Sequence, residues 1–446
     1  MQAIFRHMTV ALLGAGLALP ATAQERIEIS LGEAQQRALA QNQMLEVARE
    51  GVAQAEGMRL QTWAGHLPSV SISERVMRTN HALSAFGFRL SQERVQQADF
   101  MPDALNDPEG ITNFQTVLEV QQPLFNGGKT IYGRRQARAG VEVAEAQLQR
   151  GEQEVRLHTA EAYWGVVLAR EGLEAVRQGL ETAQAHAATA QSHFEQQTAP
   201  LSDLLAAQVR VAELRGEEIA AVNRVAQAAD GLSLVMGLDS GVEVEPADTL
   251  SYREMEAALD DLVADALTGR ADLAAAARRM EAAGHGVGVA RAEFIPHLNG
   301  FAQIGLDSEK LLEKQGESWT VGAMVTWNLF SGLRSTGALK QAKAQQAQAR
   351  AQNAFLKEQA AREVAQAWRS VKAAQSQVEI AGEAVEQAGE RLRMTGLQYQ
   401  EELVTATDLL DAETGLTQAR MRRLQALHAL NVGTARLEYA VGRPVQ

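Results

Sequence analysis

The chain contains no cysteine, which excludes disulfides, thiolate metal sites and a lipid-bearing cysteine after a leader. Aromatic residues make up only 5% of the 446 residues, and the formal net charge is −13. Such an acidic chain lacks the basic surface that binds phosphates, so nucleic acid is not an expected partner. After the N-terminus no stretch approaches about 18 uninterrupted apolar residues, so a mature chain that enters a membrane is expected to do so as strands.

The first residues have the form of a secretory leader. Arg6 and His7 precede an apolar run at residues 8–19, and residues 21–23 (Ala-Thr-Ala) have the small-x-small pattern of a cleavage site. The alternative is a membrane anchor, but the run is about a dozen residues long, and a spanning helix needs about 20. The sequence therefore predicts a signal peptide at residues 1–23 and an exported mature chain.

The sequence contains an internal duplication of one structural unit. The stretch QPLFNGGK around Phe125 returns as WNLFSGLR around Phe330, 205 residues later, and the correspondence continues without a gap to the end of each copy. The segments around Pro68 and Pro296 are 228 residues apart, so the first copy has about 23 additional residues within the polar region 77–110, which is expected to be a loop. The predicted domains are a first repeat at 24–237, a linker at 238–254 and a second repeat at 255–446.

Heptad repeats dominate both copies. Small apolar residues recur every seven positions from Val141 to Ala190, and again from Ala360 to Ala388. A sustained heptad predicts coiled-coil packing, and alanine on one seam lets neighbouring helices approach closely. A helix over residues 131–197 would be on the order of 100 Å long. Proline is scarce, and Pro200 marks the tip at which this helix is expected to turn into a second one at 202–238.

Strands are predicted between a shorter helix and the Leu-Phe motif of each copy. The shorter helices are expected at residues 31–65 and 255–293. Residues 318–327 alternate strictly, and Trp319 and Trp327 stand at the two ends of the apolar face. Weaker alternation predicts further strands at 70–72, 114–120 and 297–304.

The alternating face would cover either a soluble core or lipid. The two tryptophans would be about 26 Å apart in a strand, which resembles the interfacial aromatic belt of a membrane barrel. The alanine-rich helices also offer little large apolar surface for such a sheet to cover, so lipid is favoured. Four strands cannot close a barrel and open edges are not tolerated in lipid, so several chains are expected to share one.

The sequence resembles the TolC-like outer membrane efflux proteins in three features. These are the leader, the duplicated unit of strand, Leu-Phe motif, glycine and helix, and the Asp-Leu-Leu motifs at 203–205 and 408–410. The resemblance covers essentially the whole mature chain. It implies a mainly α fold in which long coiled-coil hairpins form a periplasmic tunnel, and four strands from each chain of a homotrimer build one twelve-stranded barrel in the bacterial outer membrane.

The same resemblance implies a function. The protein would be the passive exit duct of a tripartite efflux pump or type I secretion system. Its partners would be outer-membrane lipid, a periplasmic adaptor (membrane fusion protein), and an inner-membrane pump or ABC exporter that supplies the energy.

The resemblance also assigns a periplasmic gate. Asp408 and Asp411 fall on two ring positions, where carboxylates around the trimer axis favour cations, and Asp203 and Tyr399 fall where the family has a gate-locking hydrogen-bonded pair. Alternatives stand beside these roles. An aspartate one turn into a helix is also an ordinary stabiliser of the positive helix end, and a tyrosine on a heptad seam is also a packing residue.

The hairpin tips are the expected contact surface for the adaptor. The residues concerned are Gln197, Pro200, Leu201, Glu402 and Val404. Gln197 and Glu402 occupy positions where the family often has glycine, and Val404 replaces an arginine that some members carry at the gate. The backbone at the tips and the way in which the gate is held closed are therefore expected to differ.

Enzyme classes find no support in the sequence. It contains no H-E-x-x-H or G-x-S-x-G pattern, and the GGKT stretch at 127–130 has Pro123 where a phosphate-binding loop needs glycine. His186 and His193 share a helix face, but solvated side chains are expected there rather than a metal site. No enzymatic activity, cofactor or metal is predicted. The other rival is a non-channel periplasmic coiled-coil adaptor or scaffold, which would leave the strand between Trp319 and Trp327 unexplained.

Overall fold

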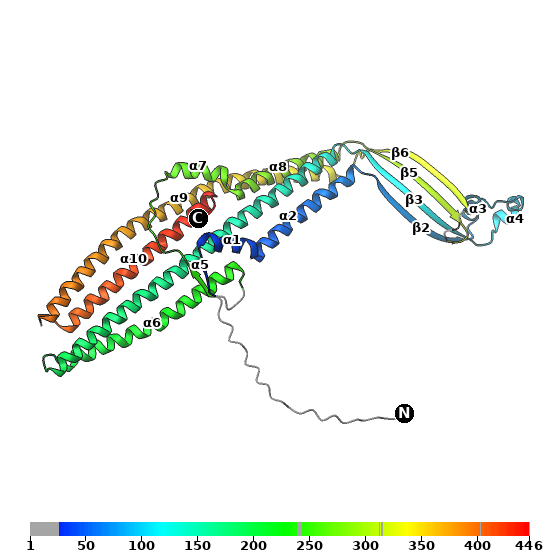
Figure 1. The fold of residues 1–446 in the computed structure, drawn as a ribbon. Coiled ribbons are helices and arrows are strands. Elements are labelled where there is room, and N and C mark those ends of the chain that lie inside the picture. Colours follow the sequence, from blue (N-terminus) through cyan, green and yellow to red (C-terminus); the bar gives the residue numbers. More distant parts are fainter. Residues whose placement is uncertain (1–25, 239–242, 312, 314, 402, 446) are drawn as a thin grey trace, which may run out of the picture. The chain divides into compact units, whose positions relative to one another are not determined.

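The computed structural model describes residues 26–445 except 239–242, 312, 314 and 402, so the predicted signal peptide and Glu402 lie outside the described residues. Figure 1 shows long helices and a β-sheet beyond one end of them, which confirms the predicted mainly α fold class. The helices are α1 (Leu31–Gln41), α2 (Gln43–Gln61), α3 (Ala82–Ser91), α4 (Pro102–Asn106), α5 (Lys129–Glu195), α6 (Leu201–Met236), α7 (Leu259–Gly269), α8 (Ala271–Ala292), α9 (Arg334–Gln400) and α10 (Ala406–Val441). The 3-10 turns are η1 (Thr62–Gly65) and η2 (Gln97–Phe100). The strands are β1 (Arg26–Ile29), β2 (Ser69–Thr79), β3 (Ile111–Phe125), β4 (Glu243–Pro246), β5 (His297–Ser308) and β6 (Gly316–Thr326).

Contacts divide the chain into two compact units, and each unit contains segments of both repeats. Among the described residues, the tip unit consists of those within Met1–Gln41, Thr159–Ser251 and Glu383–His428, and the sheet unit of those within Asn42–His158, Tyr252–Gly382 and Ala429–Gln446. This division follows three-dimensional contacts and not the duplication. The predicted boundaries of the two repeats stay a prediction.

The duplication is visible in the long helices. Helices α5 and α9 both have 67 residues, and α6 and α10 both have 36. The predicted seams are buried at many positions, among them Val155, Ala183 and Ala190 in α5 and Val371 and Ala381 in α9. Small side chains in register every seven residues therefore produce the expected close helix packing.

The two shorter helices are each broken, so the predicted single helices at 31–65 and 255–293 were wrong in this respect. Asn42 separates α1 from α2, because its side-chain oxygen accepts hydrogen bonds from the backbone N–H of Met44 (2.9 Å) and Leu45 (3.4 Å) and so caps a new helix. Arg270 separates α7 from α8 with an extended backbone, φ −71° and ψ 124°.

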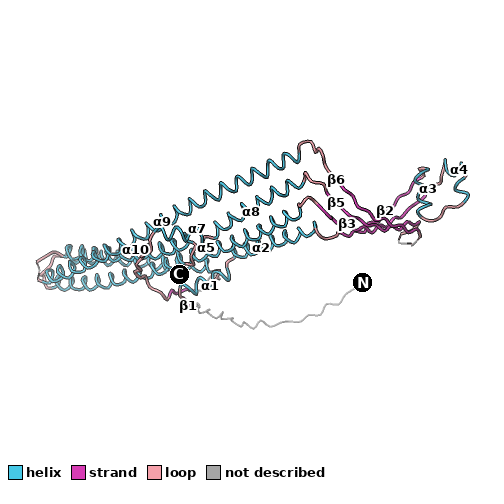
Figure 2. Tube along the Cα trace, turned by 90° about the horizontal axis from the view of Figure 1, so that it is seen from above, coloured by secondary structure: helices cyan, strands magenta, loops and turns pink. Residues whose placement is uncertain are grey.

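The sheet confirms the predicted strands and lengthens the three weaker ones. Its order is β2-β3-β5-β6, with every pair antiparallel, and Figure 2 shows the four strands as neighbours. Edge strands β2 and β6 each have one side without a partner strand in the part of the chain that the structure describes. No helix among the described residues is long and apolar enough to cross a membrane.

Two features were missed from the sequence. Strands β1 and β4 form a short parallel pair between segments far apart in the chain, in which Arg26 pairs with Glu243, and four residues are too few to show a period. The region 77–110 was expected to be a loop, but it contains the end of β2 together with α3, η2 and α4.

Candidate functional site

The register of the sheet gives it one apolar and one polar face. Residues paired directly across antiparallel strands point to the same face, and one such row crosses all four strands as Ile72, Leu118, Ile304 and Trp319. The adjacent row, on the other face, consists of Ser71, Glu119, Gln303 and Thr320. The apolar row is open to the surroundings in the single chain, with Trp319 77% and Ile72 73% exposed.

The second tryptophan of the predicted belt lies just beyond the end of β6. Trp327 is exposed, and its indole N–H donates to the carbonyl of Phe294 (3.1 Å). Lys129 begins α5 just after β3, and its half-exposed ammonium lies 3.9 Å from the carboxylate of Glu293. Polar anchors at the end of an apolar band are typical of a membrane–water interface.

The strand-to-helix turns explain the glycines of the repeated motif. Gly127 (φ 64°) and Gly128 (φ 86°) both have left-handed backbones, and a Cβ on Gly127 would lie 2.8 Å from the carbonyl oxygen of Ala292. In the second copy Gly332 (φ 62°) is followed by Leu333 (φ 68°). The turn geometry is thus kept in both copies, although only the first supplies glycine at both left-handed positions.

The first hairpin tip turns at Gln197, which has φ 62°. The N–H groups of Gln197 and Thr198 donate to the carbonyls of Phe194 (3.0 Å) and His193 (2.9 Å), as in a Schellman motif. The tip therefore has the left-handed backbone that a glycine would favour, with glutamine in its place. Pro200 then precedes α6, whose first residue is the exposed Leu201.

The predicted gate-lock residues are neighbours in the tip unit. Burial raises the pKa of the Tyr399 phenol, and the nearby charge of Asp203 raises it further. The ring of His193 also lies against Tyr399, with the centroids 6.1 Å apart. Asp203 lies in the first turn of α6, where the N-terminal dipole stabilises its charge. Asp203 is near enough for its charge to act on Tyr399, but the hydrogen bonds described for Asp203 go to Ser202 and Pro200, so the locking role stays a prediction.

Asp408 and Asp411 are both exposed and lie in the first two turns of α10. The Asp408 carboxylate accepts hydrogen bonds from the hydroxyl (2.6 Å) and backbone N–H (3.0 Å) of Thr405. The bond from the Thr405 hydroxyl has the larger effect and the bond from its backbone N–H the smaller, and together they hold the pKa of Asp408 below its usual value. In the single chain Asp408 thus caps the helix and Asp411 is open to solvent, and their role in a gate ring stays a prediction.

A pair that the sequence did not predict links α5 to α10 near these carboxylates. Nε2 of His186 lies 2.7 Å from a carboxylate oxygen of Glu413, whose side chain is buried. The contact is a hydrogen bond when Nε2 carries a proton. His186 was expected to be solvated, and it pairs with an acid instead because the heptad register brings the two helices into contact.

The duplication also marks two side chains that tie the long helices to connecting segments. Tyr163 and Trp368 occupy equivalent positions, and each donates a hydrogen bond to a backbone carbonyl, that of Ile29 (3.0 Å) and that of Ala257 (3.1 Å) respectively. The single hydroxyl proton of Tyr163 is shared between the Ile29 carbonyl and the nearer carboxylate of Asp248 (2.7 Å), and burial raises the pKa of Tyr163. The described residues include no cluster of three or more His, Asp or Glu placed to hold a metal ion.

A family model, a curated relative and several solved structures match this chain. A family model described as outer membrane efflux protein matches residues 34–238 and 262–443. The chain is 25% identical over 263 residues to the alkaline protease secretion protein AprF of Pseudomonas aeruginosa, and the match covers 56% of this chain and 52% of AprF. The chain therefore spans about half the length of that curated relative.

Solved structures share the fold over nearly the whole chain. The structure is similar to that of CusC, with a TM-score of 0.80, 19% identity, and 94% of this chain and 93% of CusC covered. It is similar to VceC from Vibrio cholerae, with a TM-score of 0.77, 22% identity, and 93% and 97% covered. It is also similar to the open state of MtrE from Neisseria gonorrhoeae, with a TM-score of 0.75, 19% identity, and 93% and 89% covered.

Proposed function

Because the chain belongs to the outer membrane efflux protein family, we propose that it is the passive exit duct of a tripartite efflux pump or type I secretion system. The protein is located in the outer membrane and extends into the periplasm, as its relatives do, and it is not a periplasmic adaptor. The family consists of channel proteins, and the absence of enzymatic activity is part of the proposal.

The observation that carries the proposal is the two-faced sheet. Its apolar face is exposed in the single chain, and its two edge strands have unpaired sides among the described residues. In water, an exposed apolar face is unfavourable. In lipid, unpaired backbone groups along a strand edge are unfavourable. Both are resolved when the β2 edge of one chain pairs with the β6 edge of the next, so that the apolar rows meet lipid and the polar rows line an aqueous passage. We propose a homotrimer with a shared twelve-stranded barrel.

This arrangement predicts the size of the particle. Protein extracted from outer membranes in a mild detergent should have the mass of three chains, measured by light scattering with the detergent contribution subtracted. The variant Val321→Pro, in the middle of edge strand β6, should lose the three-chain particle, since proline removes a backbone donor from the strand. A soluble monomer of the unaltered protein in the periplasm would rule out the shared barrel.

A second proline variant provides the matched control. Gln315 lies just before β6 and has no place in the sheet register. Gln315→Pro should therefore keep the three-chain particle. Loss of the particle in both variants would show that proline disturbs the chain in this region generally, and only the difference between them supports pairing along β6.

The tips are the proposed contact for the adaptor. Exposed leucines lie at both hairpins, with Leu201 50% and Leu403 74% exposed, and in the proposed contact they supply the apolar area that the adaptor covers. Val404 is partly buried, and Glu402 lies outside the described residues. Energy would come from an inner-membrane pump or ABC exporter that the adaptor links to the duct.

Charged tips should therefore lose the adaptor. The double variant Leu201→Asp/Leu403→Asp is expected to abolish crosslinking to the adaptor in cells, because burying two carboxylates in the contact is costly. Leu90→Asp, at a similarly exposed leucine of α3, is the matched control and should crosslink normally. Unchanged crosslinking of the double variant, with the trimer intact, would contradict the tip assignment.

A further inference from the structure

The insert between β2 and β3 is an ordered element and not a free loop. It comprises α3, η2 and α4, and it joins the ends of β2 and β3 that are farthest along the strands from α2 and α5. Figure 1 shows α3 and α4 beyond that end of the sheet. In the proposed outer-membrane arrangement this is the outer end of the passage.

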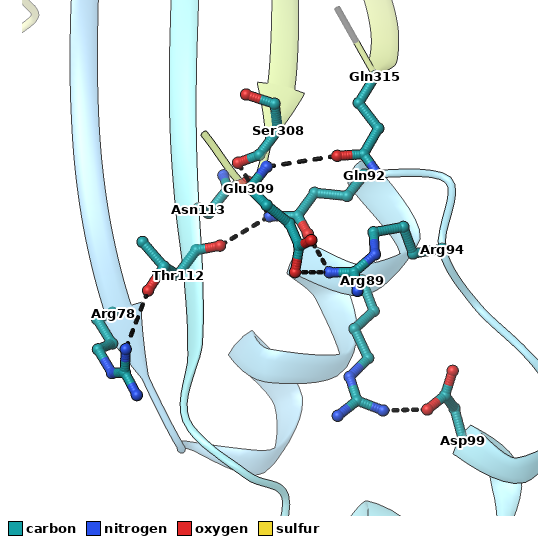
Figure 3. Close-up of polar contacts among 10 residues, drawn as sticks. All are labelled: Arg78, Arg89, Gln92, Arg94, Asp99, Thr112, Asn113, Ser308, Glu309 and Gln315. Carbon is teal, nitrogen blue, oxygen red and sulfur yellow. Dashed lines mark hydrogen bonds and ion pairs between the residues drawn. The ribbon is translucent and has the colours of Figure 1, made fainter. Parts of the chain in front are cut away.

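One buried glutamine anchors the insert to the sheet. Gln92, at the end of α3, is fully buried, and the two protons of its amide nitrogen are shared among three acceptors, which are the side-chain oxygen of Asn113 (2.8 Å) and the carbonyls of Thr112 (2.9 Å) and Ser308 (3.2 Å). Asn113 in turn donates to the Asp307 carboxylate (2.5 Å). Figure 3 shows Gln92 among its partners from β3 and β5.

Further contacts hold the insert in the same place. Arg94 pairs with Glu309 after β5, and Arg89 pairs with Asp99 within the insert (Figure 3). Gly316, at the start of β6, has no room for a side chain, because a Cβ there would overlap the carbonyl of Ser91. The insert is thus fixed against three of the four strands.

The register shows which face of the sheet the insert covers. Side chains an even number of residues apart along a strand share a face. By this rule Asn113 shares a face with Glu119 on β3, and Asp307 shares a face with Gln303 on β5. Gly316 is paired with Asp307 and belongs to the same face. All three contact points therefore lie on the polar face, opposite to the apolar row.

We propose that this insert, residues 82–108, sets the size limit of what passes the outer end of the duct. The inference rests on the proposed function, in which the polar face lines the passage. An ordered element docked on that face at its end stands in the path of the cargo. Gln92 is the positioning residue that holds it there.

Single cysteines test this inference, because the chain has no cysteine of its own. Ser71→Cys lies in the polar row and Ile72→Cys in the apolar row. Intact cells are treated with membrane-impermeant thiol reagents, from a small sulfonated reagent to maleimides on polyethylene glycol of increasing size. The small reagent should label Ser71→Cys and not Ile72→Cys, and the large reagents should label neither.

Loosening the insert should raise the size limit. Adding Gln92→Ala and Arg94→Ala to Ser71→Cys is expected to speed labelling by the large reagents by at least about tenfold, since a buried polar anchor is lost. Replacing residues 82–108 with a short glycine–serine linker should do at least as much. Gln97→Ala, an exposed glutamine of the same insert, is the matched control and should change nothing.

The outcomes separate the two proposals. If Ser71→Cys and Ile72→Cys are labelled alike, the shared barrel itself is contradicted. If Ser71→Cys alone is labelled, but with the same size limit whether the insert is anchored, loosened or replaced, the barrel stands and the inference about the insert is overturned.

Discussion

Replacing Arg270 by methionine is expected to lower the free energy of unfolding of the sheet unit by about 3 kcal/mol. The Arg270 side chain is only 4% exposed and pairs with Asp272 (2.7 Å) and Glu363 (2.7 Å). It also donates to the carbonyl of Ala440 (3.1 Å). Methionine fills a similar volume but leaves these acceptors without their donor. The lower end of the range for broken buried pairs applies, because Glu363 is 39% exposed and can be hydrated.

Arg278, in the helix α8 that begins directly after Arg270, provides the matched control. It pairs with Glu142 (2.9 Å) and Glu281 (2.9 Å), but its side chain is half exposed. Water replaces such partners readily, so Arg278→Met should leave the unfolding midpoint nearly unchanged. Thermal unfolding in detergent, followed by circular dichroism, measures both variants. If Arg270→Met and Arg278→Met had equal unfolding midpoints, the predicted contribution of Arg270 to stability would be contradicted.

The cost of Arg270→Met should also depend on pH. Burial by itself would raise the pKa of Asp272, but the hydrogen bonds and charge of Arg270 outweigh it, and the pKa lies below its ordinary value of 3.8. A lowered folded-state pKa stabilises the protein at neutral pH, and this stability is lost as pH falls through the lowered value. The free energy of unfolding should therefore differ most between wild type and Arg270→Met at pH 7, and this difference should become smaller in strong acid.

The sequence revealed the elements whose signals are local and repeated. The heptads and Pro200 placed both ends of α5 and of α6 within about two residues of those observed, and alternation located β6. The breaks at Asn42 and Arg270 were missed because the apolar period of the sequence continues through a single non-helical residue. Gln92 is bound to Ser308, 216 residues away, and no local pattern reports such a contact, so the insert was taken for a loop.

The candidate site divides in the same way. The sequence indicated that Asp408 could stabilise the start of a helix, because it lies one turn after the tip. The structure shows this contact, in which Thr405 donates two hydrogen bonds to the Asp408 carboxylate. The pair of His186 and Glu413 could not be predicted, since it depends on which heptad of α10 lies beside α5. Gln197 shows that a missing glycine does not imply a different backbone, because the hydrogen bonds of the tip impose the left-handed conformation.

Removing the charge of the proposed gate ring should change the ion selectivity of the duct. The double variant Asp408→Asn/Asp411→Asn is expected to lower the cation-to-anion permeability ratio in planar bilayers by about tenfold, the low end of the enrichment produced by a focused field of one sign. Block by divalent cations should weaken at the same time, because each chain of the trimer would lose two carboxylates at one constriction.

Asparagine separates the charge from the cap. Its side-chain oxygen can still accept the Thr405 N–H, whereas alanine at position 408 would remove both the charge and the capping bond. If the carboxylates act only as caps, the asparagine variant should conduct like wild type and the alanine variant should be the less stable of the two. If they form the ring, asparagine and alanine should reduce selectivity alike. Glu401→Gln, an exposed acid of the same hairpin, should leave selectivity unchanged, which would show that position and not net charge determines the effect.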